Sequence, residues 1–171
     1  MHTLLTGVMQ SGKTHSAKFI ANNLRQQGYT VLVRDPNLST WPAGCLVFSD
    51  LGAWMAEIKK WRRCALICDE AGDIREGAEI NAQEYNWLTT RAHHQGHGTW
   101  LLCQRPVQLM PTLRRNCRRA LVFQMDEGDA KDLGRQFCVD LSGASRLETG
   151  DHLYVRQAGK APILQRFPSS W

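Results

Sequence analysis

The sequence predicts an α/β fold built on a largely parallel sheet. Short apolar segments alternate with segments whose apolar residues recur at helical spacing, which is the pattern of strands connected by helices. A glycine-rich turn, GVMQSGKT, lies between the first predicted strand and the first predicted helix. The composition is that of a globular protein, with 43% hydrophobic and 22% charged residues among 171. We therefore expect one domain over residues 1–171.

Four strands and two helices are predicted in the first 70 residues. The first helix opens inside the glycine-rich turn, and its apolar residues keep helical spacing towards Gly28, which suits a helix end. The second helix follows Asp50, a residue type that caps helix N-termini. The predicted strands are 2–6, 30–35, 45–50 and 64–70, and the predicted helices end near residue 27 and cover about 51–62.

The remaining chain continues the same alternation. A polar loop follows residue 70, and Ala130, Leu133, Gly134 and Phe137 mark the last helix. The C-terminal segment HLYVRQAGKAPILQRF has the pattern of a β-hairpin that turns at AGKA. A further helix is expected near 80–94, and further strands at 99–104 and 120–125.

The segment GVMQSGKT has the spacing of a phosphate-binding loop. Gly7 and Gly12 let the backbone turn so that successive N–H groups point at phosphate oxygens, and the following helix adds the positive end of its dipole. Lys13 is expected to reach the β- and γ-phosphates of ATP, and the Thr14 hydroxyl to bind Mg²⁺. The predicted nucleotide-binding residues are Gly7, Val8, Met9, Gln10, Ser11, Gly12, Lys13 and Thr14.

An acidic pair ends the apolar strand that reads LICDE. Asp69 is placed to bind Mg²⁺ through water, and Glu70 to orient or deprotonate the water that attacks the γ-phosphate. The alternative is that both acids only cap the following turn. Since the two halves of the nucleotide motif occur together and in the expected order, the sequence favours an ATPase.

The cysteines and histidines argue against disulfides and metal sites, whereas the charge is compatible with a polyanionic partner. The six cysteines contain no C-x-x-C pair and several lie in apolar strands, so we expect them to be reduced and mostly buried. His93, His94 and His97 lack an acid or cysteine at metal-binding spacing. The net charge of +5 is compatible with a polyanionic partner, and basic residues cluster in KKWRRC and LRRNCRRA.

Residues 89–125 add a longer pattern to the two nucleotide motifs. Arg91 and Gly96 precede an apolar strand that ends in Gln-Arg-Pro at 104–106, and Leu-Arg-x-Asn at 113–116 precedes the strand RALVFQM. Over about residues 3–125 the chain resembles the FtsK/HerA superfamily of DNA-pumping ATPases. The resemblance implies a RecA-like P-loop NTPase core with a C-terminal hairpin, assembled into a homo-oligomeric ring, usually a hexamer.

The resemblance also implies roles for residues outside the phosphate loop. Gln104 follows the strand expected beside LICDE, which is the Walker B strand of the family. It would sense the γ-phosphate or the attacking water, because its amide both donates and accepts. An arginine of one subunit would complete its neighbour's site and stabilise the transition state. Arg91 and Arg119 match the family's positions best, among candidates that also include Arg105, Arg114, Arg115 and Arg118. The alternative for Arg105 is a simple ion pair with an acid such as Asp69 or Glu70.

Within the superfamily, the chain is most similar to the genome-packaging ATPases of tailless, internal-membrane double-stranded DNA viruses. The sequence shows neither the membrane anchors of FtsK motors nor the barrel domain of HerA. This implies ATP and Mg²⁺ as cofactors, non-specific binding to the phosphate backbone of double-stranded DNA, and docking to capsid-vertex or membrane proteins. We expect the protein in the host cytoplasm or at the packaging vertex of the virion. The candidate DNA contacts are Arg62, Arg63 and Arg75.

Two other functions remain open. The Zot-like assembly ATPases of filamentous phages have a related core and serve virion extrusion, but they carry a transmembrane segment, and no run of ~18 uncharged apolar residues occurs here. Thymidine kinases have motifs similar to GVMQSGKT and CDEAGD, with zinc-binding cysteine pairs near the C-terminus, where this chain has only Cys138. Stimulation of ATP hydrolysis by DNA distinguishes a translocase from both.

Overall fold

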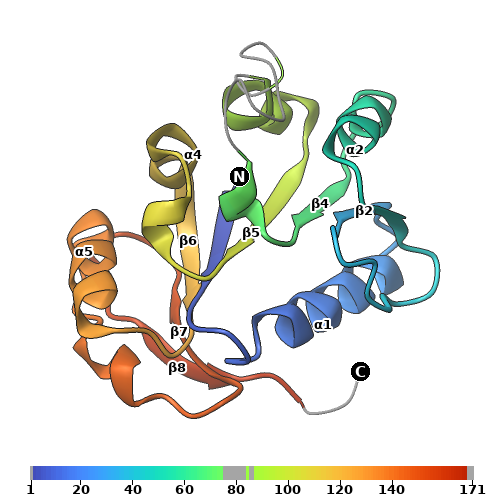
Figure 1. Ribbon diagram of the computed structural model, residues 1–171. Helices are drawn as coiled ribbons and strands as arrows, with labels where there is room; N and C mark the ends of the chain where they lie inside the picture. Colours follow the sequence, from blue (N-terminus) through green and yellow to red (C-terminus); the bar gives the residue numbers. More distant parts are fainter. Residues whose placement is uncertain (1, 75–83, 85–86, 169–171) are drawn as a thin grey trace.

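The computed structural model describes residues 2–74, 84 and 87–168, and its centre is an eight-stranded sheet (Figure 1). The strand order is β3-β2-β4-β5-β1-β6-β7-β8. The first six strands of this order are parallel, and β7 and β8 run antiparallel as a hairpin at one end. The strands are β1 His2–Thr6, β2 Val31–Arg34, β3 Leu46–Phe48, β4 Ala65–Cys68, β5 Gly98–Cys103, β6 Cys117–Val122, β7 Asp151–Val155 and β8 Ile163–Arg166. The predicted α/β class and C-terminal hairpin are therefore confirmed.

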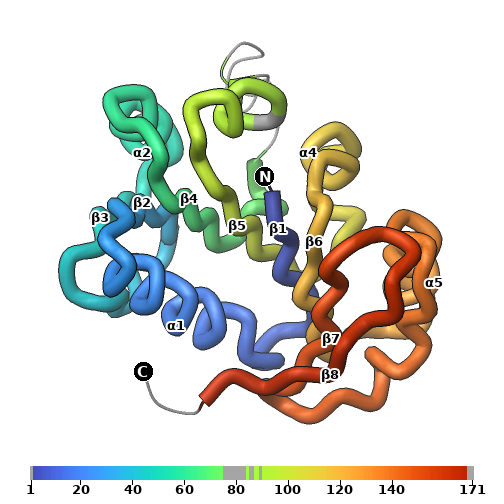
Figure 2. The backbone as a smooth tube through the Cα atoms, turned by 180° about the vertical axis from the view of Figure 1, so that it is seen from behind, coloured from blue at the N-terminus to red at the C-terminus, as the bar shows by residue number. Residues whose placement is uncertain are grey.

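The helices form two layers on opposite faces of the sheet (Figures 1 and 2). Helix α1 (Lys13–Gln26) buries Ala17 and Ala21 against the face that includes Leu5. The other face, which includes Leu4, is covered by α2 (Leu51–Ile58), α4 (Pro111–Arg115) and α5 (Glu127–Phe137). Because neighbouring residues of a strand point to opposite faces, the continuous apolar strands predicted from the sequence are needed to fill both layers.

Several predicted boundaries differ from the structure. Helix α2 is capped by Asp50 as predicted, but it ends at Ile58, where its buried stripe stops, rather than near residue 62. Strand β6 begins at Cys117 rather than at residue 120, because it continues its pairing along β1 as far as His2. Helix α4 and the 3-10 helix Ser142–Arg146 were not predicted, since five residues are too short to show helical periodicity.

The helix predicted near 80–94 is only partly covered by the described residues. Residues 75–83 and 85–86 lie outside them. The described part is a π-helical turn, Trp87–Arg91, followed by a 3-10 helix, Ala92–Gln95, that ends at Gly96 in the left-handed conformation. No helix in the described part of the chain is long and apolar enough to cross a membrane. All six cysteines are unpaired, and Cys64, Cys68, Cys103 and Cys117 are buried, as expected.

Candidate nucleotide-binding site

The predicted nucleotide residues meet at one edge of the sheet. The phosphate loop follows β1, the acidic pair follows β4, and Gln104 follows β5. Strands β4, β5 and β1 are adjacent and parallel in the sheet, so their carboxyl ends lie side by side. This is the position where open parallel sheets bind ligands.

Glycines are required in the phosphate loop because the backbone packs closely against two other segments. Gly7 has φ +154°, and a Cβ atom there would lie 2.7 Å from the carbonyl oxygen of Gln124. Gly12 has φ +105°, and its Cβ would lie 3.1 Å from the Cα of Gly150. The amide of Val8 donates to the Gln124 carbonyl (2.7 Å), and that of Gly150 donates to the Ser11 carbonyl (3.0 Å). The loop is therefore clamped between the end of β6 and the turn before β7.

The Lys13 side chain folds back over this loop. Its Nζ atom donates to the carbonyl oxygens of Gly7 and Val8, both at 2.8 Å. Burial lowers the pKa of Lys13, and the negative charge of Glu70 opposes that shift. The ammonium is thus held where phosphate oxygens can replace the two carbonyl acceptors, as the P-loop pattern predicts.

The two halves of the predicted magnesium site are in direct contact. The Thr14 hydroxyl donates to Oδ2 of Asp69 at 3.1 Å, and Asp69 is only 7% exposed. Burial raises the pKa of Asp69, although hydrogen bonds from the Glu70 amide and from Thr14 counteract it. A hydroxyl and a buried carboxylate are oxygen donors of the kind that Mg²⁺ takes, and a bound cation would favour the ionised carboxylate. The residues therefore fit the metal.

Glu70 leaves strand β4 in an unusual backbone conformation. Its φ and ψ angles, 50° and 46°, lie in the left-handed region, which costs a non-glycine residue about 1–2 kcal/mol. Burial raises the pKa of the Glu70 carboxyl, and the neighbouring charges of Asp69 and Asp73 raise it further. A strained, half-buried acid beside Lys13 has the position and the basicity of a group that deprotonates water.

Two residues of the site were not predicted from the sequence. Arg34, the last residue of β2, is buried and donates through Nη1 to the carbonyl oxygens of Asp69 and Glu70, both at 3.1 Å. Asp35 follows it and accepts hydrogen bonds from the amides of Asn37 and Ser39, the Ser39 hydroxyl and the Trp41 indole. The available signal was a charged pair at the end of the apolar run TVLVRD, which adjoins the Walker B strand in the sheet.

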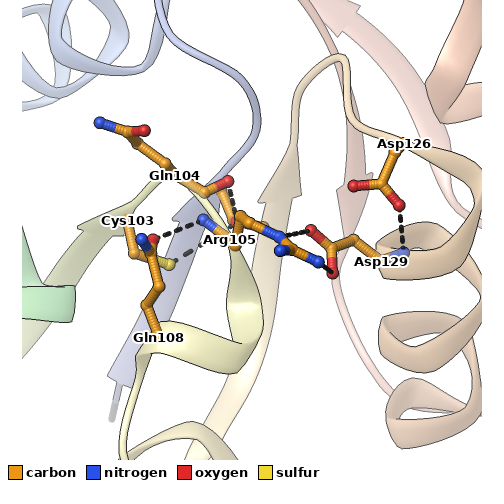
Figure 3. A network of polar contacts seen from close by, with 7 residues as sticks. Cys103, Gln104, Arg105, Gln108, Asp126 and Asp129 are labelled. Atoms are coloured by element: carbon orange, nitrogen blue, oxygen red, sulfur yellow. Dashed lines mark hydrogen bonds and ion pairs between the residues drawn. The ribbon is translucent and has the colours of Figure 1, made fainter.

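Gln104 and Arg105 diverge at the end of β5 (Figure 3). The Gln104 side chain points away from Arg105, while its carbonyl oxygen accepts from the Thr6 hydroxyl at 3.4 Å. Arg105 binds Asp129 in a bidentate pair, with Nε–Oδ2 at 2.8 Å and Nη2–Oδ1 at 3.0 Å. The alternative that Arg105 pairs with an acid is therefore confirmed, but the acid is Asp129 and not Asp69 or Glu70. The turn at Pro106–Gln108 directs this arginine towards helix α5 instead.

The Arg105–Asp129 pair should matter more for stability than a surface ion pair. Asp129 is 4% exposed, so Arg105→Met leaves a buried carboxylate without its cation, and we expect a clearly lower Tm in thermal unfolding. Arg135→Met is the matched control, because Arg135 pairs with the exposed Asp132 on the same helix, and its Tm should stay near wild type. Equal shifts in the two variants would contradict this ranking.

The remaining predicted residues lie at the opposite edge of the sheet. Arg119 is exposed on β6, paired in register with Thr3 near the start of β1, whereas Lys13 follows the end of β1. Arg91 is exposed just before the turn into β5. Neither arginine is therefore placed to act on a nucleotide bound by its own chain. Arg62 and Arg63 are exposed before β4, at the same edge, and Arg75 lies outside the described residues.

The three histidines near residue 95 do not form a metal site. His97 is buried, and its Nδ1 accepts from the Cys64 amide at 3.2 Å while Nε2 contacts Oε1 of Gln95 at 3.3 Å. The rings of His93 and His94 lie against each other, with centroids 4.0 Å apart. Within the described residues, no group of three or more histidines, cysteines or acids could hold a metal ion.

No family model and no curated protein matches this sequence, whereas solved structures match its fold over nearly the whole chain. The DNA-packaging ATPase B204 of Sulfolobus turreted icosahedral virus aligns with a TM-score of 0.75 and 17% identity over 96% of each chain. B204 of Sulfolobus turreted icosahedral virus 2, in complex with ATP-γ-S, gives the same values.

A solved structure of a protein other than B204 also matches the fold. VirB4 of Thermoanaerobacter pseudethanolicus aligns with a TM-score of 0.75 and 11% identity, over 99% of this chain and 90% of that one. At these identities the comparisons establish the fold. The fold that the resemblance implies is thus confirmed: the chain shares its fold with the DNA-packaging ATPase B204 and with VirB4.

Proposed function

We propose that this protein is an ATP-driven double-stranded DNA translocase, and specifically a viral genome-packaging ATPase that pumps DNA into a preformed capsid. The observation that carries the ATPase part is the 3.1 Å contact between Thr14 and Asp69, which joins the phosphate loop to the Walker B strand at the magnesium position. The packaging part is supported by the fold shared with B204 over 96% of both chains.

In this proposal each residue of the site has its own role in ATP hydrolysis. Mg²⁺, held by Thr14 and through water by Asp69, would supply positive charge at the β- and γ-phosphates. Lys13 binds the same phosphates, and Glu70 takes the proton of the attacking water. Gln104 senses the γ-phosphate from the neighbouring strand. Because the water loses its proton as it attacks, the position of the Glu70 carboxylate decides the rate.

The position of Arg91 and Arg119, at the edge of the sheet opposite the nucleotide site, supports assembly into a ring. In a head-to-tail ring, two different surfaces of neighbouring subunits meet. The edge that carries Arg91 and Arg119 would then face the nucleotide site of the next subunit. One of these arginines would then complete the neighbour's site and stabilise charge in the transition state. The ring, usually a hexamer in proteins that the motifs resemble, would surround DNA in the host cytoplasm or at a capsid vertex, where capsid or membrane proteins would dock it.

The decisive experiment is ATP hydrolysis with and without long double-stranded DNA at moderate salt. We expect DNA to increase kcat, and Lys13→Ala to abolish both the basal and the stimulated rate, because the ammonium that binds the phosphates is removed. Turnover that ignores DNA would argue against a translocase and for an assembly ATPase. Phosphoryl transfer seen only with thymidine would point to a nucleoside kinase.

A further inference from the structure

Arg34 contacts Asp69 and Glu70, which form the turn after the Walker B strand β4 (the Walker B turn), through both its backbone and its side chain. Its carbonyl oxygen accepts a hydrogen bond from the Asp69 amide at 2.8 Å, which continues the pairing of β2 with β4. Its guanidinium donates to the carbonyl oxygens of Asp69 and Glu70, both at 3.1 Å. One residue therefore binds the dipeptide that carries the metal ligand and the base, on the side away from the phosphate loop.

The contacts of Arg34 lie at a residue whose backbone conformation is unfavourable, Glu70. Glu70 adopts the left-handed conformation, in which a non-glycine residue stays only if its surroundings hold it there. Its amide donates to Oδ1 of its neighbour Asp69 at 3.0 Å, and its carbonyl oxygen accepts from Arg34 Nη1 and from the Asp73 amide, both at 3.1 Å. Both polar backbone groups of Glu70 thus have hydrogen-bond partners, and these bonds set the direction in which its Cα–Cβ bond leaves the turn.

The segment that follows Arg34 is closed by hydrogen bonds of its own. Arg34 is 5% exposed and Asp35 is 1% exposed. The Asp35 carboxylate accepts from the Ser39 hydroxyl at 2.6 Å and from the Trp41 indole at 2.9 Å, so it closes residues 35–41 into a compact turn. Burial raises the pKa of Asp35, but these hydrogen bonds outweigh it and the pKa is lowered. The end of β2 is therefore buried and well hydrogen-bonded where Arg34 leaves it.

We propose that Arg34 is a positioning residue for ATP hydrolysis: through the Asp69 and Glu70 carbonyls it holds Glu70 in the conformation that aims its carboxylate at the attacking water. This inference rests on the proposed ATPase function. Arg34 acts on the backbone of the Walker B turn, so its loss should affect the chemical step and not nucleotide binding. A misplacement of about 1 Å at a reacting group can cost a factor on the order of 10² in rate.

The test compares two substitutions with a matched control. Arg34→Met keeps the length of the side chain and removes its donors, and we expect kcat to fall on the order of 100-fold with the nucleotide Kd within about twofold of wild type. Arg34→Lys keeps a charged donor and should recover part of that loss. Arg25→Met is the control, because Arg25 also donates to a backbone carbonyl, that of Ala43 at 3.2 Å, but is exposed on α1.

A double-mutant cycle separates positioning from general stability. If Arg34 acts through Glu70, then Arg34→Lys should lower single-turnover hydrolysis in the wild-type background and change nothing further in Glu70→Gln. Additive losses, or a raised Kd with unchanged kcat, would overturn the inference, and the lysine variant decides even if Arg34→Met does not fold. A wild-type protein that does not hydrolyse ATP would refute the ATPase proposal itself, and the role of Arg34 with it.

Discussion

Glu70→Gln should lower kcat for ATP hydrolysis by about 10²- to 10⁴-fold, the range that a general base contributes. Glutamine has nearly the same size and can adopt the same backbone conformation, so the fold and the phosphate loop should be unchanged. It cannot accept the proton that the attacking water loses. Steady-state turnover should therefore collapse, while a fluorescent ATP analogue binds with a Kd close to that of wild type.

The control for this variant is a carboxylate on the same turn that has no proposed chemical role. Asp73 is exposed, and its charge is one of the groups that raise the pKa of Glu70. Asp73→Asn makes the same change from acid to amide and should keep kcat within a few-fold of wild type. Loss of turnover in both variants would show that the charge of the turn matters, and not the base at position 70.

The predicted site residues that the structure brings together belong to short-range sequence patterns. Gly7, Gly12 and Lys13 stand at fixed spacing in one loop, and Asp69 ends a continuous apolar strand. Such patterns are visible in a sequence because the loop and the strand end are each encoded by consecutive residues. Parallel pairing of β1, β5 and β4 then brings the motifs together at one edge, as the α/β class requires.

The parts that were missed depend on contacts between distant residues. Arg34 donates to carbonyls 35 and 36 positions further along the chain, and a backbone acceptor leaves no mark on the sequence. Arg105 pairs with Asp129, 24 residues away, rather than with the acids of the nucleotide site. Which of several acids an arginine meets is decided by how the turn at Pro106 packs against α5, and this is tertiary information.

Removing charge from the basic edge should weaken binding to double-stranded DNA. The basic edge consists of the exposed residues Arg62, Arg63, His93, His94 and Arg118. They lie in the segments that precede β4 and β5 and at the start of β6, and in the described structure they form no ion pair with an acid. The ring centroids of His93 and His94 lie 4.0 Å apart, and burial, followed by nearby positive charges that include His94 and Arg118, lowers the pKa of His93.

The arrangement suits a repeating anion better than a single one. Three strand spacings of about 4.8 Å separate β4 from β6, so the charges extend over roughly 14 Å. Duplex DNA presents one negative charge per about 1.7 Å of its axis over that length. The charges stand on side chains of several elements, an arrangement that binds phosphates without reading sequence.

The expected result for Arg62→Gln, Arg63→Gln and Arg118→Gln combined is a lower DNA affinity with a shallower salt dependence. For each phosphate that is no longer neutralised, the slope of log K against log salt should decrease in magnitude by about 0.9. The matched control replaces Lys131, Arg135 and Arg146 with glutamine. These residues carry the same total charge but lie elsewhere, around a cavity of about 800 Å³ beside α5 that no residue of the basic edge lines. Its slope should remain that of wild type, although both variants change the net charge equally.

Basal ATP hydrolysis distinguishes this role from a place in the subunit interface. If the basic edge binds DNA, the triple variant should keep its DNA-free rate and lose only the stimulation. If Arg62, Arg63 and Arg118 instead lie at a neighbour's nucleotide, as proposed for Arg91 or Arg119, the DNA-free rate and the size of the assembly should fall together while DNA binding persists. That second outcome would assign the edge to the interface within the ring and leave the DNA-binding surface to be sought among other basic residues.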